Sequence, residues 1–70
     1  MKNPTLIRFG NRLRTERVSR SLSQEELAER AGVHRTYIGM IERAEKNITL
    51  LNIQKIAKAL KTSMSNLLKI

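Results

Sequence analysis

The chain has 70 residues and carries 14 Lys and Arg against 6 Glu, so its net charge is +8 and its pI is near 11. This length allows one domain, residues 1–70, whose small core usually needs a disulfide, a metal or a second subunit for stability. Because the chain has no Cys and only one His, disulfides, clustered metal ligands and most nucleophile–base pairs are excluded. We therefore expect no metal, no cofactor and no enzymatic activity, and oligomerisation is the remaining source of stability.

Two helices are predicted in the first half of the chain. Asn3 before the only Pro is typical of a helix start, and apolar positions at helical spacing carry this helix to about Arg20. Ser23 followed by Glu26 forms a capping box, which predicts the start of a second helix. Gly32 is typical of the left-handed residue that ends such a helix.

Three further helices are predicted in the second half. A third runs from about 35 to 43, with Ile38 and Ile41 three residues apart. Thr49 caps a fourth helix and Ser63 caps a short fifth one. The apolar residues of the fourth helix recur at helical spacing: Leu50, Ile53, Ile56, Ala57 and Leu60. No segment alternates with period two, so the sequence predicts an all-α fold of five short helices.

Residues 24–43 predict a helix-turn-helix. Ala28 is small where two helices would cross, and Gly32 allows the tight turn between them. Four apolar residues form a wedge between the two helices: Leu27, Val33, Ile38 and Ile41. Arg35 and Thr36 occupy the first turn of the third helix and point away from this wedge. In a helix that lies in the major groove of DNA, such N-terminal residues contact the bases.

The surplus of positive charge also indicates a polyanionic partner. One Phe and one Tyr are too few aromatic residues for the stacking platforms of single-strand binding proteins. No long apolar stretch follows a basic start, and no run approaches the roughly 18 apolar residues of a membrane span. We therefore expect a cytoplasmic protein that binds neither a membrane nor a small-molecule ligand.

The sequence resembles the phage repressor and Cro family of helix-turn-helix proteins, the xenobiotic-response-element type. The matching residues are 22–28, 31–33, 38 and 41–43, and later 56–60 and 63–68, so the resemblance covers roughly residues 6–68. Within the family, residues 34–38 and 41–47 are most similar to the controller proteins of restriction–modification systems. The resemblance implies a bacterial dimer that binds an inverted repeat in double-stranded DNA. It would activate, and at higher level repress, its own gene and the endonuclease gene.

Three other functions remain open on the sequence: a phage-type repressor, an antitoxin that represses its own operon, and a non-enzymatic basic interaction domain. The first two would also bind operator DNA specifically. A basic interaction domain would bind cognate and scrambled DNA equally, which separates it from the others.

The resemblance implies a role for particular residues. Arg35 and Thr36 would contact base edges, and Tyr37 would contact a base or the backbone. A set that we call the phosphate residues would bind the DNA backbone: Ser23, Gln24, His34, Arg43, Lys46 and Asn47. Arg17 and Glu42 resemble a partly buried ion pair that ties the first helix to the third.

Two further surfaces are predicted. Glu25 and Glu29 share a helix face that DNA would repel, so they are expected to point past the DNA. They either complement the helix N-terminus or recruit RNA polymerase, with the sigma subunit as the candidate partner. Five apolar residues exceed the needs of one small core: Leu50, Leu51, Ile53, Leu67 and Ile70. We expect them to form a two-fold dimer through the fourth and fifth helices, which would place two recognition helices about 34 Å apart.

The chain departs from the family at several positions. Ser21 and Lys61 stand where the family tends to have Gly, and Ile48 stands where it often has Pro. Gly39 lies inside the third helix, where Gly costs about 1 kcal/mol relative to Ala. Either a close approach of the backbone to DNA or tight packing between helices would explain it.

Overall fold

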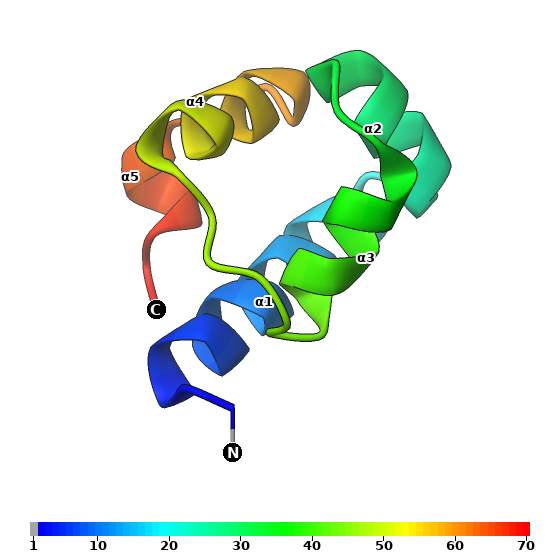
Figure 1. Cartoon of the computed structure of the whole chain (residues 1–70). Coiled ribbons are helices and arrows are strands. Elements are labelled where there is room, and N and C mark those ends of the chain that lie inside the picture. The colour runs from blue at the N-terminus through cyan, green and yellow to red at the C-terminus, as the bar shows by residue number, and fades with distance from the viewer. Residues whose placement is uncertain (1) are drawn as a thin grey trace.

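The computed structural model describes residues 2–70, and these residues form five helices without a strand (Figure 1). The helices are α1 (Pro4–Ser19), α2 (Gln24–Ala31), α3 (Arg35–Glu42), α4 (Leu50–Ala59) and α5 (Met64–Leu67). The predicted all-α fold of five helices is therefore confirmed, and α1 and α3 end one residue earlier than expected. No helix within residues 2–70 is long and apolar enough to cross a membrane.

Side-chain caps fix four of the five helix starts. Asn3, Ser23, Thr49 and Ser63 each accept a hydrogen bond from a backbone N–H in the first turn of the following helix. Ser23 also has the reciprocal bond of the predicted capping box. Each such cap stabilises its helix by about 1 kcal/mol. His34 precedes α3 but makes no side-chain cap bond.

Left-handed backbone occurs at four turns within the described chain. Gly32 ends α2 with φ 71°, as predicted. Ser21 (φ 56°), Ala44 (φ 60°) and Lys61 (φ 57°) adopt the same conformation although each carries a side chain. This conformation costs a non-glycine residue roughly 1–2 kcal/mol. Ser21 and Lys61 are the positions where the family tends to have Gly, so the departure from the family introduces local strain.

The helices enclose one core. Figure 1 shows the helices arranged around this core: α1 packs against α3 and α5, and α4 packs against α2 and α5. Seven large side chains are almost fully buried: Leu13, Leu27, Ile38, Ile41, Ile56, Leu60 and Leu67. The apolar wedge predicted between α2 and α3 lies within this core, with Val33 packed at its edge.

The expectation that Ile53 and Leu67 are spare apolar residues is wrong. Leu67 is 0% exposed and Ile53 is 8% exposed, because both side chains fill the space between α4, α5 and the rest of the chain. A chain with five short helices needs more apolar residues for its own core than the composition suggests. The remaining candidates for a dimer surface, Leu50, Leu51 and Ile70, are exposed.

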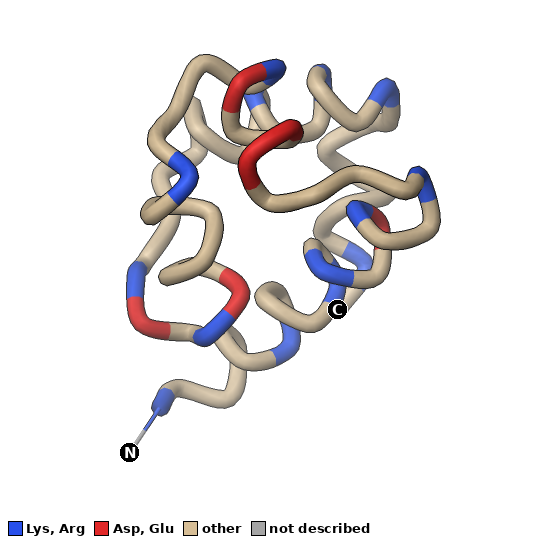
Figure 2. The backbone as a smooth tube through the Cα atoms, turned by 90° about the vertical axis from the view of Figure 1, so that its right-hand side faces the viewer, with Lys and Arg blue, Asp and Glu red and all other residues tan. Residues whose placement is uncertain are grey.

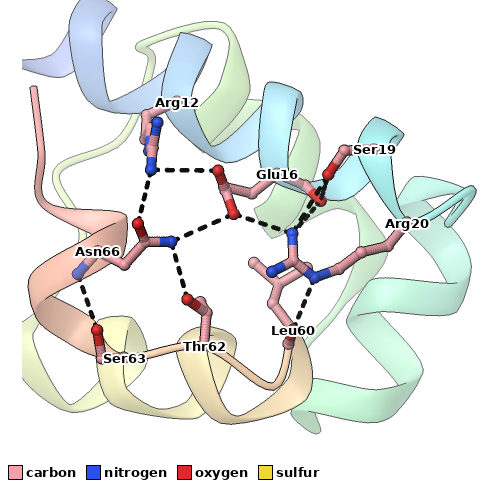
Figure 3. A network of polar contacts seen from close by, with 8 residues as sticks. All are labelled: Arg12, Glu16, Ser19, Arg20, Leu60, Thr62, Ser63 and Asn66. Carbon is pink, nitrogen blue, oxygen red and sulfur yellow. Dashed lines mark hydrogen bonds and ion pairs between the residues drawn. The ribbon is translucent and has the colours of Figure 1, made fainter.

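Two contacts hold α1 in place. At Gly10, α1 lies directly against α3: a Cβ atom there would stand 2.6 Å from the Ile41 carbonyl oxygen and 2.7 Å from that of Glu42. Glu16 lies at the centre of a polar network between α1 and the α4–α5 end of the chain (Figure 3). It pairs with Arg20 at 2.9 Å. Arg20 in turn donates to the Leu60 carbonyl oxygen at 2.7 Å.

Candidate nucleic-acid interface

The first turn of α3 presents its polar side chains to solvent. Ile38 is fully buried in the core, so the residues on the opposite side of the helix face outward. The Arg35 side chain is 68% exposed, and Thr36 is also exposed. This is the orientation that a helix needs to contact base edges in a major groove.

A hollow of about 540 Å³ lies between α2 and α3. We call it the α2–α3 hollow, and it is lined by Arg17, Ser23, Gln24, Glu25, Arg35, Thr36, Gly39 and Arg43. It brings together two of the three residues expected to contact bases, Arg35 and Thr36, and three of the phosphate residues. Lys46 and Asn47 are exposed in the loop after α3, outside the hollow. His34 borders a neighbouring hollow of about 380 Å³, which shares Glu25, Arg35 and Thr36 with the first.

A buried carboxylate lies beneath the α2–α3 hollow. Glu42 is 3% exposed, and its oxygens accept hydrogen bonds from Arg17 Nε at 2.7 Å and Arg17 Nη2 at 3.0 Å. Gln24 Nε2 donates to the same carboxylate at 3.1 Å. The ion pair that the resemblance implies is thus present, and it joins α1 and α3 as expected.

The surroundings of Glu42 and Arg17 keep both side chains charged. Burial alone would raise the pKa of Glu42, but the hydrogen bonds from Arg17 and Gln24 and the Arg17 charge lower it below its usual value. The hydrogen bond to Glu42 also raises the pKa of Arg17. Both groups therefore stay charged near neutral pH, and the ion pair fixes the orientation of Gln24.

Tyr37 does not line the α2–α3 hollow. Its ring packs against the core, and its hydroxyl accepts a hydrogen bond from Asn52 Nδ2 in α4 at 2.8 Å. The structure thus gives Tyr37 a contact that ties α3 to α4. Arg35 and Thr36 are the better placed candidates for base contact.

The acidic face of α2 lies closer to the candidate interface than expected. Glu25 borders the α2–α3 hollow, and its carboxylate lies 3.5 Å from Arg35 Nη1. It therefore does not point past the DNA-facing residues, because α2 and α3 cross with their exposed first turns side by side. Glu29 lies one turn further along α2 and is also exposed. Exposed pairs such as Glu25–Arg35 are weak, so DNA can displace the carboxylate.

Basic residues that the sequence did not single out extend the surface. Figure 2 shows Lys and Arg spread over most of the chain, with Glu gathered in short stretches. Lys2 and Arg14 border a hollow of about 360 Å³ that Arg43 also lines. The Lys2 ammonium donates to the Arg43 carbonyl oxygen. Neither residue lies in the helix-turn-helix motif, so the motif gave no signal for them.

The apolar candidates for a dimer surface are exposed. Leu50 and Leu51 begin α4 and are 67% and 70% exposed, and Ile70 at the C-terminal end is 46% exposed. Adjacent exposed leucines are unusual on the surface of a small monomer.

No group of three His, Cys, Asp or Glu that would hold a metal occurs within residues 2–70.

The sequence of this chain matches a known family and known proteins. Residues 13–67 match the helix-turn-helix family. The chain is 54% identical over 56 residues to the control protein C.SmaI of Serratia marcescens, which covers 80% of this chain and 67% of that protein. It is 46% identical over 69 residues to the control protein C.BamHI of Bacillus amyloliquefaciens, which covers 97% and 85%.

Solved structures agree with these relatives. The restriction–modification controller protein C.AhdI of Aeromonas hydrophila has a TM-score of 0.87 and 45% identity, over 89% of this chain and 90% of that one. The regulator SinR, solved in complex with DNA, has a TM-score of 0.82 and 34% identity, over 87% and 98%. The fold and the exposed start of α3 therefore define a helix-turn-helix DNA-binding transcriptional regulator. More specifically, the chain belongs to the control proteins of restriction–modification systems.

Proposed function

We propose that this chain is a dimeric controller that binds an inverted-repeat operator upstream of the genes it regulates. Each protomer would insert the first turn of α3 into the major groove, and the two copies of α3 would lie about 34 Å apart on the duplex. A first dimer would activate the controller and endonuclease genes, and further dimers would repress them. The family and the charge of +8 support this proposal.

The α2–α3 hollow is the observation that carries the proposal. It places Arg35 and Thr36 beside Ser23, Gln24 and Arg43, so one surface holds groups for base edges and groups for phosphates. Arg35 would donate two hydrogen bonds to a guanine, and Thr36 would contact a thymine methyl or a base edge. The remaining phosphate residues, His34, Lys46 and Asn47, would contact the backbone on either side.

A titration with two duplexes tests DNA recognition. A labelled duplex from the region directly upstream of the gene is compared with a scrambled duplex by fluorescence anisotropy over a range of salt concentrations. We expect at least a roughly 10³-fold preference for the upstream duplex and a steep negative log–log salt slope. Arg35→Ala should weaken the upstream complex about 5- to 150-fold for each of its two half-sites, and the scrambled complex far less.

The control for this titration is a double variant, Lys55→Ala with Lys58→Ala. These two lysines border a hollow between the last residues of α2 and α4, which shares no lining residue with the α2–α3 hollow. The control should lose general attraction to DNA but keep its preference for the upstream duplex. Equal affinity of the unmodified chain for both duplexes would instead favour a basic interaction domain.

We propose that the dimer forms around Leu50, Leu51 and Ile70. Burying these exposed side chains in a partner stabilises a chain whose own core is small. A variant with Leu50→Lys and Leu51→Lys should sediment as a monomer with its helical content unchanged. A monomeric unmodified chain at tens of micromolar would contradict this part of the proposal.

We propose that Glu29, with Glu25, contacts RNA polymerase, with the sigma subunit as the candidate. Glu25 is already next to Arg35, so its substitution would also disturb the residue that reads bases. Glu29→Ala is therefore the cleaner variant: Glu29 borders the neighbouring hollow with Arg35 and Thr36, but Arg35 forms its ion pair with Glu25. It should bind the upstream duplex normally and lower transcription from a reporter. If transcription from the reporter is normal, Glu29 does not contact RNA polymerase and only stabilises α2.

A further inference from the structure

Gly39 is a buried residue inside α3 that lies in the lining of the α2–α3 hollow. Its position in the helix interior is unfavourable for Gly, because Gly loses more backbone freedom on folding than any other residue. We therefore ask which neighbouring atoms require the absence of a side chain at position 39.

Tight packing between helices is not the reason. A Cβ atom at Gly39 would meet three side-chain atoms first: Arg43 Nη1 at 2.9 Å, Gln24 Oε1 at 3.3 Å and Arg43 Cζ at 3.7 Å. At Gly10, by contrast, the nearest atoms are carbonyl groups of α3, which cannot move aside. Gly39 therefore makes room for two polar side chains and not for another helix.

These two side chains come from different helices and are both phosphate residues. Gln24 begins α2, and its amide is held from below by Glu42 at 3.1 Å. Arg43 follows α3, and its Nε donates to Glu45 Oε1 at 3.0 Å from the loop side. Each side chain thus makes one hydrogen bond away from Gly39, while Gln24 Oε1 and Arg43 Nη1 lie over the Gly39 backbone.

We propose that Gly39 is a positioning residue for DNA binding. Its missing side chain leaves room for the ends of Arg43 and Gln24 over the same point of α3, so that both act on the same backbone phosphate of the operator. Gln24 has a second amide hydrogen to donate, and Arg43 supplies the positive charge. The inference rests on the proposed function, because it takes DNA as the occupant of the α2–α3 hollow.

Side chains held in place before binding lose less conformational freedom when DNA arrives. A methyl group at Gly39 would push the end of Arg43 by several tenths of an ångström, away from Gln24. The arginine would still be charged, but the two groups would no longer converge. We therefore expect Gly39→Ala to lower the affinity for DNA without destabilising the fold.

Gly39→Ala tests the inference because it should stabilise the fold and at the same time weaken DNA binding. Ala favours the helix, and the displaced Arg43 end is flexible, so the Tm should rise by about 4–8 °C. The affinity for the upstream duplex should fall about 3- to 10-fold, while the salt slope should change far less than in Arg43→Ala, because Arg43 keeps its charge. Thr15→Ala, on the exposed face of α1, is the matched control: it should raise the Tm without changing the affinity.

A double-mutant cycle with Arg43→Ala separates the explanations. If Gly39 acts through Arg43, Gly39→Ala causes no further loss of affinity once Arg43 is already Ala. An equal loss in both backgrounds would mean that the methyl group acts on Gln24 or on the DNA itself and not through Arg43, which would overturn the inference. Unchanged affinity, or a lowered Tm, of Gly39→Ala would overturn it too. If the unmodified chain fails to prefer the upstream duplex, the proposed function itself fails.

Discussion

Gly10 is the position where a single methyl group should damage the fold most. In Gly10→Ala the new Cβ atom would lie 2.6 Å and 2.7 Å from the carbonyl oxygens of Ile41 and Glu42. Carbon and oxygen atoms that are not bonded approach to roughly 3.3 Å. The axes of α1 and α3 must therefore separate by about 0.7 Å, because neither carbonyl can rotate out of the way.

This separation loosens contacts beyond Gly10 itself. Phe9 and Leu13 lie on the same side of α1 and pack in the core against α3, and a gap of this size loses a quarter or more of their dispersion energy. Overpacking of this kind costs about 3 kcal/mol at the upper end of its range. The gain in helix propensity from Gly to Ala returns roughly 1 kcal/mol. The net destabilisation is about 2 kcal/mol.

Thermal and urea unfolding followed by circular dichroism measures this effect. The Tm of Gly10→Ala should be roughly 8–16 °C below that of the unmodified chain, with an unchanged urea m-value. All samples need the same protein concentration, since dimer formation would contribute to stability. Gly39→Ala is the matched control, because the same substitution meets only flexible side chains there and should raise the Tm. A Gly10→Ala chain as stable as the unmodified one would refute the reasoning on close contact between α1 and α3.

Three further predictions concern stability. Glu42→Gln should destabilise the chain by about 3 kcal/mol at neutral pH, because it removes the counter-charge of the partly buried Arg17. Since the folded pKa of Glu42 lies below its unfolded value, the contribution of the carboxylate is complete above about pH 5 and disappears as the pH falls through the folded pKa. The variant should therefore lose less stability than the unmodified chain on acidification in urea titrations, and an equal loss would contradict the role of Glu42. Ser21→Gly and Lys61→Gly should each stabilise the chain by roughly 1 kcal/mol in thermal unfolding, and a lower Tm would show that neither turn is strained. Tyr37→Phe should lower the stability of the fold by about 1 kcal/mol, because it loses the hydrogen bond to Asn52. Its preference for the upstream duplex should not change. A reduced preference would mean that Tyr37 contacts a base.

Local signals in the sequence were sufficient for much of the fold. Cap residues such as Ser23 and the left-handed Gly32 mark helix ends through hydrogen bonds and dihedral angles that depend on a few neighbouring residues. The exposed position of Arg35 follows from the same local periodicity, because Ile38 three residues later must face the core. These elements were predicted correctly for this reason.

Contacts between distant segments had no comparable signal. The network around Glu16 joins α1 to Asn66, fifty residues away, and its members resemble solvated surface residues in the sequence. Leu67 was assigned to a dimer surface because composition does not show how much apolar volume five helices require. The pairing of Glu25 with Arg35 depends on the crossing of α2 and α3, which periodicity within one helix does not specify.

A footprint on the upstream DNA tests the central claim most directly. If two copies of α3 read an inverted repeat, the chain should protect two major-groove patches whose centres are about 10–10.5 base pairs apart. Arg35→Ala should abolish both patches at the same protein concentration. A single patch, or two patches that persist in Arg35→Ala, would contradict the claim that the exposed first turn of α3 recognises the operator.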